Sequence, residues 1–369
     1  MPRLRPQFPS GPCRIAIVGE APGKSEELLG EPFVGASGQE LTRMLAEAGI
    51  ARSACYITNV FLTRPPDNKI LNWCASKKDV GGKAYPYPSI QQGKYLRLEH
   101  IHDVQESDIG ARDPGGANAR TVLERLRNEL QLVSPNLVIA LGNTACWALL
   151  GTSGIKAIRG TATLSTLVPG LKVIPTYHPA MVLRDWSART VCVFDFLKTL
   201  RESDRKSIIR PERFVHIEPT VTDLFQWEAK IAAGTVVSFD IETGAQMMKC
   251  IGFSVDERDA YVVPFFDLRK PGGNYWPDAK SEKLAWQVVR RILNSHKIKL
   301  AQNGFYDIQY LWRAGVPTKN FSEDTMLAHH ALQPELQKSL GFLGSIYTDE
   351  ASWKLLRPRS DDIAEKKDE

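Results

Sequence analysis

The sequence predicts an α/β protein of two domains, the first built on a parallel sheet in three layers (α/β/α) and the second on a mixed sheet. Three observations lead to this prediction. The chain has 369 residues, about twice the usual domain length of roughly 150 residues. Short apolar strands alternate with helices through the first half, which is typical of a parallel sheet. The second half places three strands ahead of its later helices, which favours a mixed sheet.

The first domain is expected over residues 12–203. Its strands are short apolar runs, as expected of strands that are covered on both faces. We expect strands at 14–18, 55–60, 137–141 and 172–175, and helices at 38–48, 122–132 and 144–150. The alternation of strands and helices is interrupted by an insertion at 67–119, which is rich in Pro, Gly, Lys, Tyr and Gln. An irregular connection of that length is typical of a functional lid or a mobile insertion.

A charged and weakly patterned stretch at residues 204–215 is expected to be a linker. The second domain is then expected over residues 216–369. Its strands are expected at 235–240, 251–255, 260–264 and 298–301, and its helices at 221–233, 282–295 and 306–314. The two halves share a fold class but no motif, so the sequence does not predict an internal repeat.

Composition limits the possible partners. With 47 Lys and Arg against 42 Asp and Glu, the formal net charge of +5 permits nucleic acid as a partner without requiring it. No apolar run approaches the roughly 18 residues that span a bilayer, and no secretory signal is recognisable, so we expect no membrane partner. The 6 cysteines form no Cys-x-x-Cys pair. This predicts reduced thiols in a cytoplasmic protein, without a zinc site or an iron–sulfur cluster.

Polar and aromatic side chains gather where the strands of the first domain are expected to end. Glu20 follows the first strand, with Glu26 and Phe33 shortly after it, Asn59 ends the second strand, and His178 follows the fourth. These ends share the edge at which open α/β sheets bind ligands. The residue types suit a base that has been flipped out of DNA. An aromatic face stacks on the base, an amide pairs with its edge, a neutral imidazole donates to an oxygen that gains charge, and a carboxylate orients water.

The motifs in this half follow an order known from one family. Gly-Glu-Ala-Pro-Gly (19–23), Pro-Phe-Val-Gly (32–35), Thr-Asn (58–59), Arg-Pro-Pro (64–66), Leu-Gly (141–142) and His-Pro (178–179) stand in that order. The set resembles the uracil-DNA glycosylase superfamily, closest to its family 4 type. The resemblance implies that Phe33 stacks on uracil and that Asn59 reads its edge. It further implies that His178 stabilises the departing uracil anion, with Glu20 and Glu26 near the sugar and the attacking water.

The same resemblance implies that the segment with Leu183 and Arg184 enters the DNA minor groove and holds the flipped state. Family 4 enzymes usually carry an iron–sulfur cluster on four cysteines. Thr63 stands where one of those cysteines would precede Arg-Pro-Pro, and Cys13 alone remains of the N-terminal pair, so we expect no cluster. Ala21 occupies the place of the water-activating Asp of the best-known uracil glycosylases.

A second constellation lies in the other half. Asp240 and Glu242 are two residues apart on an expected strand, which puts both carboxylates on one face. Two adjacent carboxylates favour a hard divalent cation between them. Asp307 stands in the first turn of an expected helix. Phe-Asp-Ile-Glu-Thr (239–243) and Asn-x-x-x-Asp (303–307) resemble the first two motifs of the DEDD 3′–5′ exonuclease domain of family A DNA polymerases. The resemblance implies an RNase H-like fold and the metal ligands Asp240, Glu242 and Asp307, whereas Asp324 matches a position that is not normally a ligand.

The third motif of that domain, Tyr-x-x-x-Asp, is not found before the chain stops at Glu369. We therefore expect an N-terminal piece of a longer phage-type polymerase, whose remainder would be a partner, acting in the host cytoplasm if phage-encoded. A natural chain that lost the motif is the alternative. In either case Mg²⁺ or Mn²⁺ is expected at the exonuclease site only if that site is completed.

Two functions remain open for the first domain. In one, it is an enzyme that excises uracil or a modified pyrimidine from DNA by hydrolysis of the N-glycosidic bond. In the other, it is a module of a replicative polymerase that binds DNA or modified bases without cleavage. Glu20, Glu26, Asn59 and His178 favour the enzyme. Ala21 and the long insertion favour the binding module.

Overall fold

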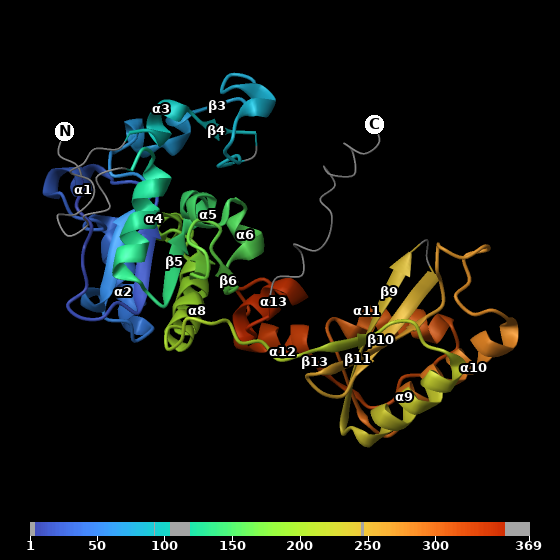
Figure 1. Ribbon diagram of the computed structural model, residues 1–369. Helices are drawn as coiled ribbons and strands as arrows, with labels where there is room; N and C mark the ends of the chain where they lie inside the picture. Colours follow the sequence, from blue (N-terminus) through green and yellow to red (C-terminus); the bar gives the residue numbers. More distant parts are fainter. Residues whose placement is uncertain (1–3, 92, 104–118, 245–246, 351–369) are drawn as a thin grey trace. The chain divides into compact units, whose positions relative to one another are not determined.

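The computed structural model describes residues 4–91, 93–103, 119–244 and 247–350, which fall into two units (Figure 1). The first unit runs to Ile209 and takes in the chain again from Gly341, and the second unit spans Arg210–Leu340. The boundary at Ile209 lies inside the predicted linker. The predicted extent of the second domain differs, because residues 341–350 pack with the first unit. The rest of the predicted second domain, residues 351–369, lies outside the described residues.

The first unit is built on a five-stranded sheet in the order β2-β1-β5-β7-β6. Four strands are parallel, and every residue in them is buried: β1 (Ile15–Gly19), β2 (Cys55–Asn59), β5 (Leu137–Leu141) and β7 (Lys172–Thr176). The short β6 (Thr163–Leu164) pairs antiparallel with β7. The parallel α/β architecture predicted for this half is confirmed. Burial of whole strands requires cover on both faces, which explains why they read as unbroken apolar runs.

Helices connect these strands. The longer ones are α2 (Ala36–Glu47), α4 (Val122–Val133), α5 (Gly142–Leu150) and α8 (Ser187–Glu202), and the shorter ones are α1 (Lys24–Leu29), α6 (Ile155–Ile158) and α7 (Pro179–Val182). The first strand and the second end in register, with Gly19 opposite Asn59, and so do the next two, with Leu141 opposite Thr176. The carboxyl ends of all four strands therefore meet at one edge of the sheet.

The described part of the insertion belongs to the first unit. It holds the single-turn helices η2 (Pro66–Asn68), η3 (Ile70–Trp73) and η4 (Gly82–Ala84), the antiparallel pair β3 (Cys74–Ala75) and β4 (Tyr95–Leu96), and α3 (Leu98–Ile101). Trp73 stacks on His100 with 4.6 Å between ring centroids. Trp147 of α5 donates from Nε1 to the carbonyl oxygen of Pro88 at 2.9 Å. Residues 92 and 104–118 of the predicted insertion lie outside the described residues.

The second unit is built on a six-stranded sheet in the order β13-β12-β9-β10-β11-β8. The sheet contains parallel and antiparallel pairs, so the predicted mixed sheet is confirmed. Its strands are β8 (Phe214–His216), β9 (Val236–Gly244), β10 (Met247–Ser254), β11 (Asp259–Pro264), β12 (Ile298–Ala301) and β13 (Phe321–Asp324). The strands β9, β10 and β11 form an antiparallel meander, and β12 and β13 continue the sheet in parallel from β9. The helices are α9 (Val221–Ala233), α10 (Ala279–Leu293), α11 (Gly304–Arg313) and α12 (Thr325–Leu332).

The two faces of β9 differ sharply. Phe239 and Ile241 are buried in the core of the second unit, whereas Asp240 and Glu242 are exposed on the opposite face. The predicted period-two placement of the two carboxylates is therefore present.

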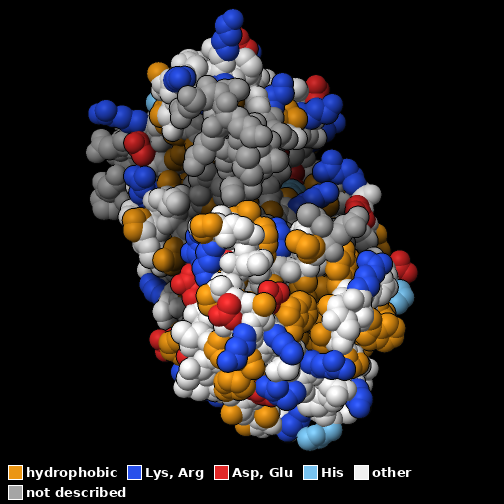
Figure 2. Space-filling model, turned by 90° about the vertical axis from the view of Figure 1, so that its right-hand side faces the viewer, with side chains coloured by type: hydrophobic (Ala, Val, Ile, Leu, Met, Phe, Trp, Pro, Cys, Tyr) orange, Lys and Arg blue, Asp and Glu red, His pale blue; other side chains and the backbone are white. Residues whose placement is uncertain are grey.

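In the view of Figure 2, apolar and basic side chains lie interleaved over the visible face. No helix of the described residues is both long and apolar enough to cross a membrane.

A buried ion pair ties α4 to the end of β2. Arg125 is 1% exposed and forms an ion pair with Glu129, one turn further along the helix. Its other terminal nitrogen donates to the carbonyl oxygens of Asn59 and Val60, both at 2.7 Å. Thr58 completes the network by donating to Glu129 at 3.0 Å. These bonds fix the backbone of the strand end that carries Asn59.

We expect Arg125→Met to destabilise the first unit by about 3–5 kcal/mol, because Glu129 would be left as a buried charge without its cation. Urea denaturation followed by tryptophan fluorescence measures the change. Arg43→Met is the control, since the Arg43 side chain is 67% exposed and Glu40 keeps a second cation, Arg189, when Arg43 is removed. Loss of such a surface contact costs about 1 kcal/mol or less. The double variant Arg125→Met with Glu129→Met should recover part of the loss. Equal stability of Arg125→Met and wild type would contradict the assignment.

Candidate active site

A cavity of about 460 Å³ opens where the four parallel strands of the first unit end. We call it the strand-end cavity. Its walls come from the turn after β1, the loop before α2, the end of β2, the start of α5, the turn after β7 and the insertion. Six of the site residues that the sequence predicts line this cavity: Glu20, Glu26, Phe33, Asn59, His178 and Arg184. Side chains that follow separate strands in the sequence thus share one cavity.

Glycines make room for the aromatic wall of the cavity. Phe33 has a φ of 53°, an uncommon conformation for a residue with a side chain. A Cβ atom at Gly19 would lie 2.5 Å from Cζ of Phe33 and 2.3 Å from Oδ1 of Asn59. A Cβ atom at Gly38 would lie 1.8 Å from the carbonyl oxygen of Phe33. Both positions exclude any larger residue, since real contacts are never this short.

Glu26 holds the loop that carries Phe33. Its Oε1 accepts hydrogen bonds from the backbone N–H groups of Val34 at 3.0 Å and Gly35 at 2.8 Å. Its Oε2 accepts from the backbone N–H of Gly23 at 3.1 Å. The side chain is 7% exposed. Both oxygens of this carboxylate thus accept hydrogen bonds from the backbone, so Glu26 positions the loop that carries Phe33. The role near the sugar and the attacking water that the sequence predicts for Glu26 stays a prediction.

His178 is held as a neutral donor. Its Nδ1 accepts a hydrogen bond from the backbone N–H of Ala180 at 3.1 Å, so the ring proton resides on Nε2. Burial, with a further contribution from the charge of Arg184, lowers the pKa of His178 to about 4. Its ring lies 5.7 Å from the ring of Phe33, centroid to centroid, at an angle of 33°. A neutral imidazole beside an aromatic face can donate to an oxygen that gains negative charge without itself carrying a charge.

Asn59 and Glu20 supply the other polar groups. Oδ1 of Asn59 is fully buried and has no hydrogen-bond partner among the residues that the structure describes, so an acceptor is free for a ligand's N–H. Glu20 accepts a hydrogen bond from the hydroxyl of Thr144. Burial raises the pKa of Glu20, although Thr144 and Arg184 act in the opposite direction. Glu20 is therefore the acidic side chain of the cavity whose carboxylate is not committed to backbone donors.

The two predicted DNA-binding residues are placed differently. Arg184 lines the strand-end cavity and donates from Nε to the carbonyl oxygen of Ala180 at 3.1 Å. Leu183 is not among the lining residues and is 48% exposed. An exposed leucine beside the cavity mouth is the geometry that a side chain entering a DNA groove needs, and that role stays a prediction.

Sequence reasoning missed several walls of the cavity. Thr144 lies in the first turn of α5, just after the Leu-Gly motif, and that motif could have indicated it. Pro65 of the Arg-Pro-Pro motif also lines the cavity, and the insertion contributes Asn68, Ile70, Leu71, Ile90 and Gln91. No periodicity marks these residues, because they lie in short turns held by aromatic contacts.

The predicted metal site of the second unit lies at β9 and the start of α11. Oδ1 of Asp307 accepts from the backbone N–H of Ile241 at 2.9 Å, and the side chain is 3% exposed. Burial raises the pKa of Asp307 to about 6, and Asp240 adds to the shift. Burial likewise raises the pKa of Asp240, followed by the charge of Glu242. No group of three His, Cys, Asp or Glu side chains is positioned to hold a metal ion within the described ranges, and the metal-ligand role of Asp240, Glu242 and Asp307 stays a prediction.

Asp324, in contrast, is a structural residue. Its carboxylate accepts from the backbone N–H groups of Asn303 at 3.0 Å and Gly304 at 2.9 Å, and from Met326 at 2.9 Å. It thereby joins the start of α12 to the start of α11, as expected of a carboxylate that caps a helix.

Among solved structures, the chain is similar to the exonuclease domain of Nibbler from Aedes aegypti and to RNase D from Escherichia coli. The first has 14% identity and a TM-score of 0.28, covering 40% of this chain and 78% of that one. The second has 14% identity and a TM-score of 0.29, covering 42% of this chain and 40% of that one. Scores this low carry no conclusion about the second unit.

Comparison of sequences is informative for the first unit. A type-4 uracil-DNA glycosylase from Archaeoglobus fulgidus is 31% identical over 192 residues, covering 50% of this chain and 75% of the relative. The type-4 enzyme from Thermotoga maritima is 29% identical over 176 residues, covering 47% and 68%. The family model described as the uracil DNA glycosylase superfamily matches residues 6–201, which span the whole strand-end cavity. The match takes in more than half of the sequence, and the chain belongs to the uracil DNA glycosylase superfamily.

Proposed function

We propose that the first unit excises uracil, or a modified pyrimidine, from DNA by hydrolysis of the N-glycosidic bond. The observation that carries the proposal is the convergence of Phe33, the free Oδ1 of Asn59 and the neutral ring of His178 in one cavity. A cavity of about 460 Å³ is large enough for a flipped base and part of its sugar. The relatives named as type-4 uracil-DNA glycosylases support the substrate class.

Each side chain has a distinct part in this reaction. Phe33 stacks on the flipped base, and Asn59 accepts a hydrogen bond from an N–H on its edge. Nε2–H of His178 donates to the base oxygen that gains charge as the bond to the sugar breaks. Glu20 orients water or stabilises the cationic sugar. Ala21 cannot activate water, so the carboxylate next to it in sequence carries that part of the chemistry.

The direct test is incubation with single- and double-stranded oligonucleotides that contain one uracil, followed by alkali, which cleaves at abasic sites. Cleavage at the uracil supports the proposal. Retention of the labelled strand without cleavage would instead support the binding module, the function that Ala21 favours.

We also propose that the second unit is a 3′–5′ exonuclease-type domain of a family A, phage-type DNA polymerase. The proposal rests on Phe-Asp-Ile-Glu-Thr (239–243) and Asn-x-x-x-Asp (303–307), and on the exposure of Asp240 and Glu242 on one face of β9. The six cysteines are free thiols, which supports a reducing, cytoplasmic compartment for the protein.

We expect His178→Ala to lower the single-turnover excision rate by about 10²–10³-fold, the loss that follows removal of one oxyanion donor. Binding of the uracil oligonucleotide should change little, because phosphate contacts dominate affinity. The matched control is His296→Ala, since His296 is exposed in the second unit. An excision rate equal to that of wild type would remove His178 from the reaction.

The pKa of His178, lowered to about 4, predicts the pH dependence of excision. The imidazole is neutral above that value, so the single-turnover rate should not rise when pH is lowered from about 8 to about 5.5, through the ordinary pKa of histidine near 6.5. Below this range the rate should fall as Glu20 and then His178 gain protons. A rate that increases on acidification through about pH 6.5 would show that His178 acts as a cation.

For the second unit we expect little degradation of DNA with Mg²⁺ or Mn²⁺, since no described group of three ligands is positioned for an ion. The measurement is release of nucleotides from a 3′-labelled strand, with Asp240→Ala as the matched control for a contaminating nuclease. Robust degradation that Asp240→Ala abolishes would contradict the prediction, and would require a ligand beyond Asp240, Glu242 and Asp307.

A further inference from the structure

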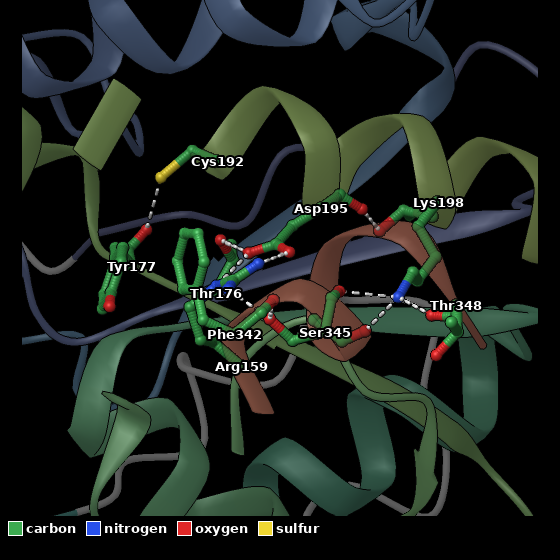
Figure 3. Close-up of polar contacts among 11 residues, drawn as sticks. Arg159, Thr176, Tyr177, Cys192, Asp195, Lys198, Phe342, Ser345 and Thr348 are labelled. Atoms are coloured by element: carbon green, nitrogen blue, oxygen red, sulfur yellow. Dashed lines mark hydrogen bonds and ion pairs between the residues drawn. The ribbon is translucent and has the colours of Figure 1, made fainter. Parts of the chain in front are cut away.

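The segment after the second unit returns to the first unit. Helix α13 (Leu340–Tyr347) and the residues that follow it contact α8 and the turn after α6 (Figure 3). Nζ of Lys198 donates to the carbonyl oxygens of Ser345 at 2.8 Å and Thr348 at 2.6 Å, and to that of Gly160 at 2.8 Å. Arg159 donates from Nη1 to the hydroxyl of Ser345 at 2.8 Å. Lys198 and Arg159 are 2% and 3% exposed.

The first unit is shaped for this contact. An ammonium group at the carboxyl end of a helix bonds carbonyl oxygens that the helix itself leaves unpaired. A Cβ atom at Gly160 would lie 2.8 Å from the carbonyl oxygen of Ser345 and 2.7 Å from Oδ1 of Asp195. Gly160 has a φ of 72°, so both its conformation and its lack of a side chain are needed. Without the segment, the ammonium group of Lys198 would lose the carbonyl oxygens of Ser345 and Thr348 and would keep that of Gly160. Loss of hydrogen-bond partners from a buried charged group is unfavourable.

The same cations connect the segment to the strand end that carries His178. Arg159 forms an ion pair with Asp195, and Nε donates to Oδ2 of Asp195 at 3.0 Å. Oδ2 of Asp195 also accepts from the hydroxyl of Thr176, the last residue of β7, at 2.6 Å. The guanidinium carbon of Arg159 lies 5.9 Å from the ring centroid of Tyr177 and 5.6 Å from that of Phe342 (Figure 3).

Further contacts restrain the turn itself. Sγ of Cys192 contacts the carbonyl oxygen of Tyr177 at 3.8 Å. On the other side, a Cβ atom at Gly142 would lie 3.2 Å from Cβ of His178. The turn Thr176-Tyr177-His178 is therefore packed between α5 and the Arg159–Asp195 pair, and that pair is packed against the returning segment.

We propose that residues 341–350 are a positioning element of the strand-end cavity: docked on Arg159 and Lys198, they hold the turn that presents His178. The role in excision rests on the proposed function, whereas the mechanical link between the segment and the turn does not. The element follows the second unit in the chain, so the positioning of the catalytic histidine depends on residues that sequence alone assigns to another domain.

The test uses the full chain and two variants of opposite charge. Ser345→Lys places a third cation beside Arg159 and Lys198 and should release the segment, whereas Ser345→Glu, of similar size, offers Arg159 an acceptor and should keep it docked. Ser339→Lys is a further control, because Ser339 is exposed just before α13. Hydrogen–deuterium exchange is measured in peptides that cover 341–350 and 172–182, together with single-turnover excision and KM.

In Ser345→Lys we expect faster exchange in both peptides, and an excision rate lower by about tenfold to a hundredfold, as for misplacement of a catalytic group. KM should change little, because Phe33 and Asn59 lie on other elements. Ser345→Glu and Ser339→Lys should behave as wild type. Faster exchange in 341–350 alone, with unchanged exchange in 172–182, would overturn the proposal, and so would unchanged exchange in 341–350.

If wild type does not excise uracil, the proposed function fails, and exchange in 172–182 still decides whether the segment positions the turn. If Ser345→Lys does not fold, Ser345→Ala takes its place, since it removes one hydrogen bond and adds no charge. A smaller increase of exchange in both peptides would then support the proposal, and an increase confined to 341–350 would overturn it.

Discussion

The strand-end cavity depends on the carboxylate of Glu26. Three backbone N–H groups from two separate loops converge on its two oxygens. One of these loops follows β1, and the other carries Phe33 in a left-handed conformation. Such a conformation costs about 1–3 kcal/mol and persists only where the surroundings fix it. Charge-assisted bonds to a buried carboxylate are among the stronger hydrogen bonds in proteins, so Glu26 can offset this cost and keep the aromatic face in place before any base enters.

Buried cations elsewhere in the first unit serve the backbone in a similar way. Arg125 bonds the carbonyl oxygens that end β2, and Lys172 bonds Glu202 and the carbonyl oxygen of Ser207. Arg159 and Lys198 act on the turn after α6 and on the returning segment. Each of these charges is paired or bonded to carbonyl oxygens, as burial of a charge requires. These bonds therefore add to the packing at both ends of the parallel strands.

The fold class of both halves could be predicted because it follows from the order of apolar runs. Glu20, Asn59 and His178 of the strand-end cavity could be predicted for the same reason, since parallel strands end at one edge. What could not be predicted are roles set by a bond between a side chain and a distant backbone group. Arg125 is an ordinary helix residue in the sequence, and only its bonds to the carbonyl oxygens of Asn59 and Val60, 66 and 65 positions earlier, show that it holds the end of β2.

Domain boundaries follow the same rule. Residues 341–350 carry no pattern that separates them from the helices before them, because the contacts that draw them to the first unit belong to Arg159 and Lys198, about 150 to 190 positions earlier. The insertion is similar, since Asn68 and Gln91 line the cavity from turns whose aromatic side chains contact residues elsewhere in the chain, such as Trp73 with His100 and Tyr87 with Trp147. In both cases the deciding residues lie elsewhere in the chain, where a local reading of sequence cannot find them.

The return of the chain also makes the second unit an insertion within the first, joined to it at both Ile209 and Gly341. While folded, the second unit fixes the separation of its two ends. When it unfolds, the same residues become a long flexible loop, and keeping its ends in place has an entropic cost that grows with the logarithm of loop length. Loss of structure in the second unit would therefore weaken the grip of Arg159 and Lys198 on Ser345. The two units are linked in stability through chain connectivity, even without any surface contact between them.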